Sequence, residues 1–180
     1  MLVESAEKER SLTSLVKDYL FKPEDRPMLY SDLTRHGFSQ HLNYCVITFG
    51  LEMEREEKPD AQIMEHLHEM MEWEVNKLPG SSVIFKNDGR YMVITAGMMT
   101  KDIERFVVQM KKKHMGDTAK LHIAVSSHKE NLTSLPKNFE MANRVYALGI
   151  ILSEPVLYYD ELETYKLLLL VSDKKEMKDY

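Results

Sequence analysis

Two short β-rich runs separated by a turn-forming segment constrain the fold of this chain more than any other feature. The runs cover residues 82–85 and 91–94, and Asn87, Asp88 and Gly89 lie between them. Asparagine, aspartate and glycine tolerate the positive φ angles that a tight turn requires. The sequence therefore predicts a β-hairpin that turns at these three residues.

The segments on either side of the hairpin predict a regular alternation of strands and helices. Before it come an apolar strand at residues 43–53 and a helix at residues 59–78 with an apolar stripe. After it come a helix that begins near Thr100 and a strand at residues 121–126. A βαββαβ order of this kind is typical of an α+β, ferredoxin-like sandwich, in which helices back a mainly antiparallel sheet.

Two further helices are expected ahead of this core, at residues 6–20 and 28–35. The first has apolar residues at helical spacing, namely Leu12, Leu15, Val16 and Tyr19. We interpret residues 1–40 as a helical connector. Its apolar stripe is suited to pairing with a second copy of the chain, and we therefore expect a homodimer.

Three more elements are expected beyond the last core strand. Pro136 stands near the start of a helix, because proline is tolerated in a first helical turn. Residues 155–159 predict an edge strand, where proline is also tolerated. A final helix is expected from about Asp160.

Composition and charge exclude several classes of protein. A net charge of −5 argues against direct binding of nucleic acid by this segment. The single cysteine, Cys45, rules out a disulfide within the chain and fits a reducing compartment. No signal peptide is recognisable, and the apolar run at residues 167–171 is far too short to span a bilayer. We expect a cytoplasmic protein without membrane contact.

Three clusters of reactive side chains are candidate sites. His66 and His68 are two residues apart, which places them about 200° apart around a helix, so they cannot share a metal ion. The lysines at residues 111–113 suit a helix C-terminus, where the macrodipole favours cations. The Ser-Ser-His run at residues 126–128 gives no geometry for a nucleophile and its base. We expect no catalytic residue, metal or cofactor.

The element order, with a tight hairpin in its middle, resembles the GGDEF domain of nucleotide cyclases. In that family the turn runs Gly-Gly, two acidic residues and Phe, and its carboxylates help to hold the metal. The corresponding positions here are Asn87, Asp88, Gly89, Arg90 and Tyr91. Glycine and arginine thus stand in the two acidic positions, while the tyrosine keeps the aromatic ring.

The second group of metal ligands in the cyclases comes from the end of the first strand. The aspartate of that strand falls near Gly50, and Glu52 is the only carboxylate nearby. Two divalent ions that bridge triphosphate oxygens need several carboxylates to offset their charge. The resemblance therefore implies a degenerate GGDEF-like domain that has lost nucleotide cyclisation.

The downstream half resembles the PucR/CdaR family of bacterial transcription regulators. In a helix after the last core strand, Asn138 replaces the usual serine, Phe139 replaces the tyrosine, and Ala142 matches. Residues 156–168 are similar to the strand-and-helix ending of that family. The resemblance extends over about residues 12–172.

Members of that family carry this domain between a variable N-terminal sensor and a C-terminal helix-turn-helix. The resemblance implies a connector at residues 1–40, a degenerate GGDEF-like domain at 41–172, and at 173–180 the start of a linker to a DNA-binding domain absent from this chain. The expected function is signal relay and dimerisation, with DNA contacted only through the absent domain and a small-molecule effector of unspecified chemistry.

Two other functions stay open at this point. One is a divergent nucleotide-binding enzyme related to the cyclases, and the other is a stand-alone scaffold without a ligand. Incubation with GTP or ATP and Mg²⁺ separates the first from a regulatory domain. A thermal-shift screen with small molecules bears on the second, because a specific ligand stabilises the fold.

Overall fold

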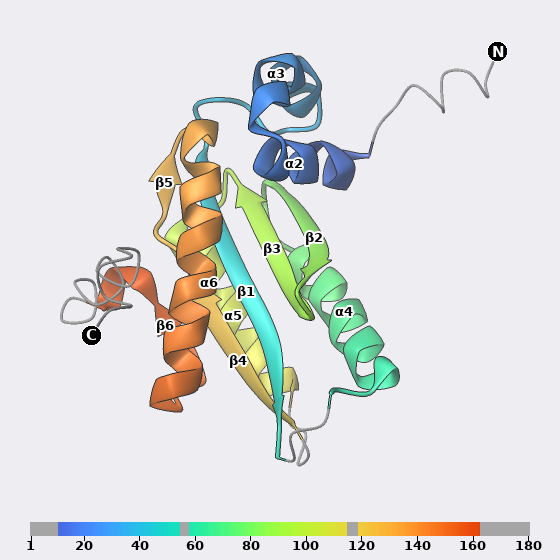
Figure 1. The fold of residues 1–180 in the computed structure, drawn as a ribbon, viewed down its shortest axis with the longest axis vertical. Helices are drawn as coiled ribbons and strands as arrows, with labels where there is room; N and C mark the ends of the chain where they lie inside the picture. Colours follow the sequence, from blue (N-terminus) through green and yellow to red (C-terminus); the bar gives the residue numbers. More distant parts are fainter. Residues whose placement is uncertain (1–10, 55–57, 115–118, 163–180) are drawn as a thin grey trace, which may run out of the picture.

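The computed structural model describes residues 11–54, 58–114 and 119–162 (Figure 1). The expected core is present as β1 (Asn43–Met53), α4 (Ala61–Val75), β2 (Ser81–Asn87), β3 (Arg90–Ala96), α5 (Thr100–Lys113) and β4 (Ala119–Val125). The strands lie in the order β2-β3-β1-β4, with all three neighbouring pairs antiparallel. This is the strand order of a ferredoxin-like βαββαβ unit, and it confirms the α+β fold class.

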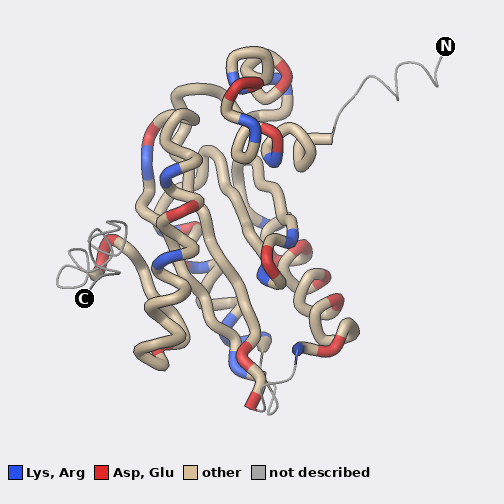
Figure 2. The backbone as a smooth tube through the Cα atoms, viewed as in Figure 1, with Lys and Arg blue, Asp and Glu red and all other residues tan. Residues whose placement is uncertain are grey.

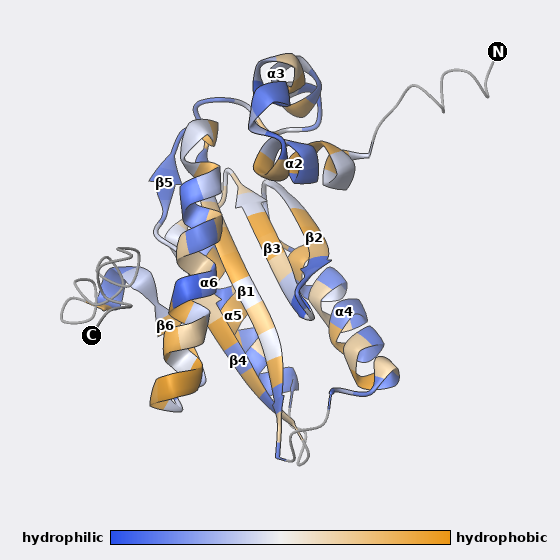
Figure 3. Ribbon diagram, in the orientation of Figure 1, coloured by the Kyte–Doolittle hydropathy of each residue, from blue (hydrophilic) through white to orange (hydrophobic). Residues whose placement is uncertain are grey.

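Both faces of the sheet are covered. On one face, side chains of β1 such as Ile47 and Phe49 pack with α4 and α5. On the other, Tyr44 and Val46 pack with α2 (Leu12–Phe21), α3 (Arg26–Arg35) and α6 (Leu135–Leu152). The alternation follows from the two-residue period of a strand. Figure 3 shows the resulting apolar strands between helices whose outer sides are hydrophilic.

The hairpin turns on two residues. Asn87 pairs with Arg90 as the last step of the strand register, so Asp88 and Gly89 alone form the turn. Their φ angles are 52° and 73°, which is the backbone of a type I′ turn. Asn87, which the sequence placed in the turn, is the last residue of β2, so the turn begins one position later than predicted.

The N-terminal helices are part of the core. Leu15, Val16 and Tyr19 are each 1% exposed or less, because α2 lies across the end of the sheet, and Leu12 packs at the edge of the same cluster. The apolar stripe expected to pair with a second copy is therefore already covered by the chain itself. Residues 1–40 were expected to form a separate connector. The two helices in that range, α2 and α3, instead pack against the sheet.

The C-terminal elements extend the sheet by one edge strand. β6 (Val156–Tyr158) pairs with β4 in parallel, and β5 (Lys129–Glu130) pairs with the start of β1. Short 3₁₀ turns cover Pro23–Asp25, Leu132–Ser134 and Tyr159–Glu161. The helix expected from about Asp160 overlaps the described residues only at its start, where Tyr159–Glu161 form a 3₁₀ turn, and the rest of it and the linker at 173–180 lie outside the described residues. None of the described helices is long and apolar enough to cross a membrane.

Candidate functional site

A cleft opens where the tip of the hairpin parts from β1. Pairing of β1 with β3 ends at Phe49 and Tyr91, whereas pairing of β1 with β4 continues to Met53. The space between the hairpin tip, the end of β1, the start of α4 and α6 has a volume of about 560 Å³. We call it the hairpin cleft, and its lining is Gly50, Leu51, Lys58, Pro59, Met64, Lys86, Asp88, Gly89, Arg90 and Tyr146.

The strand side of this cleft is closed by a tyrosine from α6. A Cβ atom added to Gly50 would lie 1.9 Å from the Tyr146 hydroxyl oxygen and 2.5 Å from its Cζ. Atoms cannot approach so closely, so Gly50 accepts no side chain while Tyr146 keeps its place. Burial raises the pKa of Tyr146, with Arg90 acting in the opposite direction.

Positive charge gathers at the same place. The Arg90 guanidinium carbon lies 4.2 Å from the centre of the Tyr146 ring, within the range of a cation–π contact. Lys86 and Lys58 also line the cleft, against the single carboxylate of Asp88. Figure 2 shows basic positions, in blue, at the hairpin tip and next to the start of α4. The charge is opposite to that of a carboxylate site for divalent metal ions.

The one carboxylate expected near the first-strand position is used elsewhere. Glu52 Oε2 lies 2.6 Å from Nε2 of His122 on β4, and His122 Nδ1 lies 3.3 Å from the Glu154 carbonyl oxygen. His122 is buried, with an oxygen facing each ring nitrogen. Glu52 and His122 line a second cleft of about 470 Å³ rather than the hairpin cleft.

A comparison with family models decides which family this architecture represents. The model described as "GGDEF-like domain" matches residues 22–148, more than half of the chain. This chain belongs to the GGDEF-like domain family. A comparison with curated proteins finds no match.

The five turn positions of this GGDEF-like domain separate into two groups. Asp88 and Gly89 form the exposed turn, and together with Arg90 they line the hairpin cleft. Asn87 is the last residue of β2, while the Tyr91 side chain packs in the layer that contains α4 and α5. The Tyr91 hydroxyl donates a hydrogen bond to the Met64 carbonyl oxygen over 3.1 Å, so this residue anchors the hairpin to α4.

The three residues of α6 that carry the resemblance to the PucR/CdaR motif are buried and hold the helix against the sheet. Asn138 Nδ2 donates to the Tyr44 carbonyl oxygen over 3.4 Å, and the Phe139 ring stacks on that of Phe85. Ala142 is fully buried one helical turn before Tyr146. These contacts fix the height and rotation of α6, and through them the position of the Tyr146 hydroxyl above Gly50.

The other clusters considered in the sequence do not form sites. Ser127 Oγ lies 3.0 Å from Asp160 Oδ1, whereas His128 contacts Thr100, so no serine–histidine pair forms. The His68 ring stacks on the Tyr91 ring, with 5.2 Å between the two ring centres. Among the described residues there is no group of three or more histidine, cysteine, aspartate or glutamate residues that could hold a metal ion.

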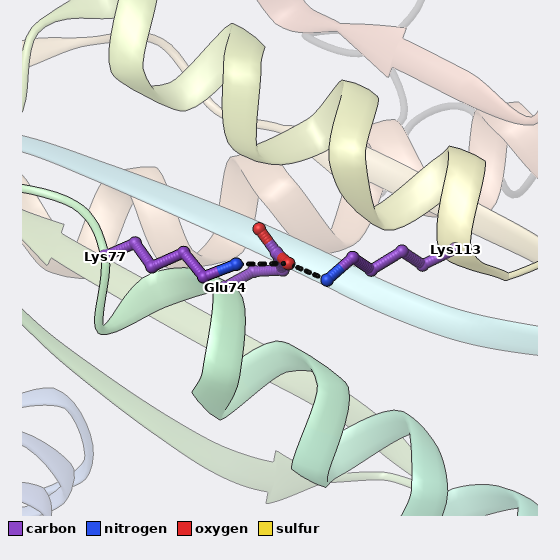
Figure 4. A network of polar contacts seen from close by, with 3 residues as sticks. All are labelled: Glu74, Lys77 and Lys113. Carbon is purple, nitrogen blue, oxygen red and sulfur yellow. Dashed lines mark hydrogen bonds and ion pairs between the residues drawn. The ribbon is translucent and has the colours of Figure 1, made fainter.

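The structure also shows the surroundings of Lys113 and Cys45. Lys113 has a specific partner, because it joins Lys77 in binding the carboxylate of Glu74, which is 6% exposed (Figure 4). The macrodipole alone therefore does not account for that lysine. Cys45 is 1% exposed, and burial raises the pKa of its thiol to about 12, which is typical of an inert core thiol.

Sequence reasoning missed Tyr146, Lys58 and Lys86 as parts of a site. Tyr146 could not be assigned to a site from the sequence, because its contact with Gly50 joins distant parts of the chain. One local signal was present. A glycine inside an otherwise apolar strand often marks a close approach by another group, and Gly50 is such a residue.

Proposed function

We propose that this GGDEF-like domain is a non-catalytic regulatory domain of a PucR/CdaR-type transcription regulator. It relays a signal to a helix-turn-helix outside this chain. The observation that carries the non-catalytic part is the Tyr146 hydroxyl above Gly50. It occupies the place into which a metal-binding carboxylate of the first strand would extend.

The electrostatics of the cleft support the same conclusion. Cyclisation of a nucleoside triphosphate requires divalent ions on the phosphate oxygens, and carboxylates to hold those ions. Here Arg90 stands at one of the acidic positions of the turn, and Lys58 and Lys86 also line the cleft. These cations repel a divalent metal ion, so the cleft disfavours binding of the metal that cyclisation needs.

The regulatory part rests on the resemblance of α6 and on charge. Asn138, Phe139 and Ala142 match or replace the family positions and are used to set the helix against the sheet. The net charge of −5 suits a domain that leaves DNA contact to another part of its protein. We propose a homodimer as well, through a surface other than the buried stripe of α2.

A turnover assay tests the non-catalytic part. We expect purified protein incubated with GTP or ATP and Mg²⁺ to release no more pyrophosphate than the same sample with EDTA. The Arg90→Gln variant, which removes one cation from the cleft, should be equally inactive, because Gly50 still lacks a carboxylate. Nucleotide turnover that Mg²⁺ supports and EDTA abolishes would contradict the proposal.

A further inference from the structure

We propose that the hairpin cleft binds a small organic anion directly, without a metal ion, through Lys58, Lys86 and Arg90. The proposal rests on the function proposed above, because it takes the cleft to be free of catalytic metal. The class of ligand is an organic phosphate or polycarboxylate.

The arrangement of charge is the first argument. Lys58 precedes α4, Lys86 lies on β2 and Arg90 begins β3. Lys86 shares the α4 face of the hairpin with its cross-strand partner Tyr91, whereas Arg90 lies on the α6 face, so the cations line the cleft from both of its sides. Asp88 is the only carboxylate among the described residues that line it. Within the described part of the chain, none of the three cations forms an ion pair. Two of them lie against aromatic rings, Lys86 over Tyr91 at 5.7 Å and Arg90 over Tyr146 at 4.2 Å, and these contacts leave both charges unneutralised.

The position of Arg90 is the second argument. Its guanidinium carbon lies 4.2 Å from the centre of the Tyr146 ring, and among the described residues its N–H groups donate to no acceptor. A guanidinium offers two parallel N–H donors that match the oxygens of a carboxylate or phosphate group. Stacking on a buried ring restrains this donor before the ligand arrives, which lowers the entropy lost on binding.

A further donor lies at the same point. The Tyr146 side chain is 7% exposed, and its hydroxyl has no hydrogen-bond partner among the described residues. It faces the cleft above Gly50. The raised pKa keeps this hydroxyl protonated at neutral pH, so it donates to an oxyanion rather than repelling one.

The size and the walls of the cleft define the rest of the ligand. A volume of about 560 Å³ exceeds what one phosphate or carboxylate group fills. Leu51, Pro59 and Met64 provide apolar surface beside the cations. Small-molecule sites commonly combine an apolar lining with a few polar groups that fix orientation. The ligand is therefore expected to place its carbon skeleton on these three residues and its negative groups on the cations.

Calorimetric titration of the full chain, freed of metal ions on a chelating resin and kept in metal-free buffer, tests the site with two probes, pyrophosphate and citrate, which separate a phosphate ligand from a polycarboxylate ligand. We expect saturable binding of at least one probe. Lys86→Gln and Arg90→Gln should each weaken that binding about tenfold, the loss typical of one charge-assisted hydrogen bond. Arg105→Gln, on the exposed side of α5, is the matched control and should leave the affinity unchanged.

Three results would overturn the site: no saturable binding of either probe, equal affinity in all variants, or binding that requires Mg²⁺. Lys86 is exposed, so its variant tests the site even where Arg90→Gln alters the packing of Tyr146. Failure here is distinguishable from failure of the proposed function. Metal-dependent nucleotide turnover contradicts that function, whereas absence of anion binding leaves the turnover result as it stands.

Discussion

At position 50 the chain has room for a hydrogen atom and nothing larger. We expect Gly50→Ala to lower the free energy of unfolding by about 1–3 kcal/mol, the usual cost of overpacking a core. In a Tyr146→Ala background the same change should cost much less, because the ring that it strikes is gone. Urea denaturation of the four proteins in this double-mutant cycle measures the difference. An equal cost in both backgrounds would show that Tyr146 is not what excludes a side chain.

At the same scale, the sequence could show what was missing from the site but not what had replaced it. Aligning the turn exposed Gly89 and Arg90 at acidic positions, since those residues are read directly from the chain. The partner above Gly50 depends on how α6 is rotated against the sheet. That rotation is set by long-range packing of residues such as Asn138, which no local pattern reports.

At the scale of elements, prediction succeeded where the signals were local. The hairpin follows from Asp88 and Gly89, whose chemistry suits positive φ, and the stripe of α4 follows from its helical period. What joins one element to another was not predictable. The carboxylate of Glu74 on α4 binds Lys77, which follows the same helix, and Lys113 on α5. These contacts join two helices on one face of the sheet.

This tie gives a pH-dependent prediction. Hydrogen bonding from Lys113, with a smaller contribution from Lys77, lowers the pKa of Glu74 from its ordinary value of 4.5 although burial opposes the shift. A lowered pKa means that the stabilisation is complete above the unfolded-state value and is lost as pH falls through the folded-state value. Glu74→Gln should therefore lower the melting temperature by a few degrees at pH 7, and the gap from the wild type should close as the pH falls well below 4.5.

The control for this ion-pair prediction is Glu69→Gln, which removes an exposed carboxylate from the same helix. Its melting temperature should stay close to that of the wild type at both pH values, because an exposed charge contributes little. A gap between Glu74→Gln and the wild type that persists unchanged at low pH would show that the glutamate acts through packing rather than charge.

At the scale of the whole molecule, the strand order was predictable and the role of the N-terminal helices was not. An amphipathic stripe states only that one face of a helix is covered. It does not identify the cover, and both a second copy and the chain's own sheet satisfy the pattern. In the structure, α2 covers the end of the sheet and shares a core with Tyr44, Val83 and Phe85. A change in the packing of the sheet would therefore alter the packing of this helix directly.

Leu15→Ala tests that assignment. Leu15 is 1% exposed, so the variant should lose about 2–5 kcal/mol of unfolding free energy, as core leucines do. Because the contact is intramolecular, the loss should not depend on protein concentration. Leu12→Ala, at the partly buried edge of the same helix, is the matched control and should cost less. Light scattering completes the test, since a mass that falls by half in Leu15→Ala would show that this stripe joins two copies of the chain.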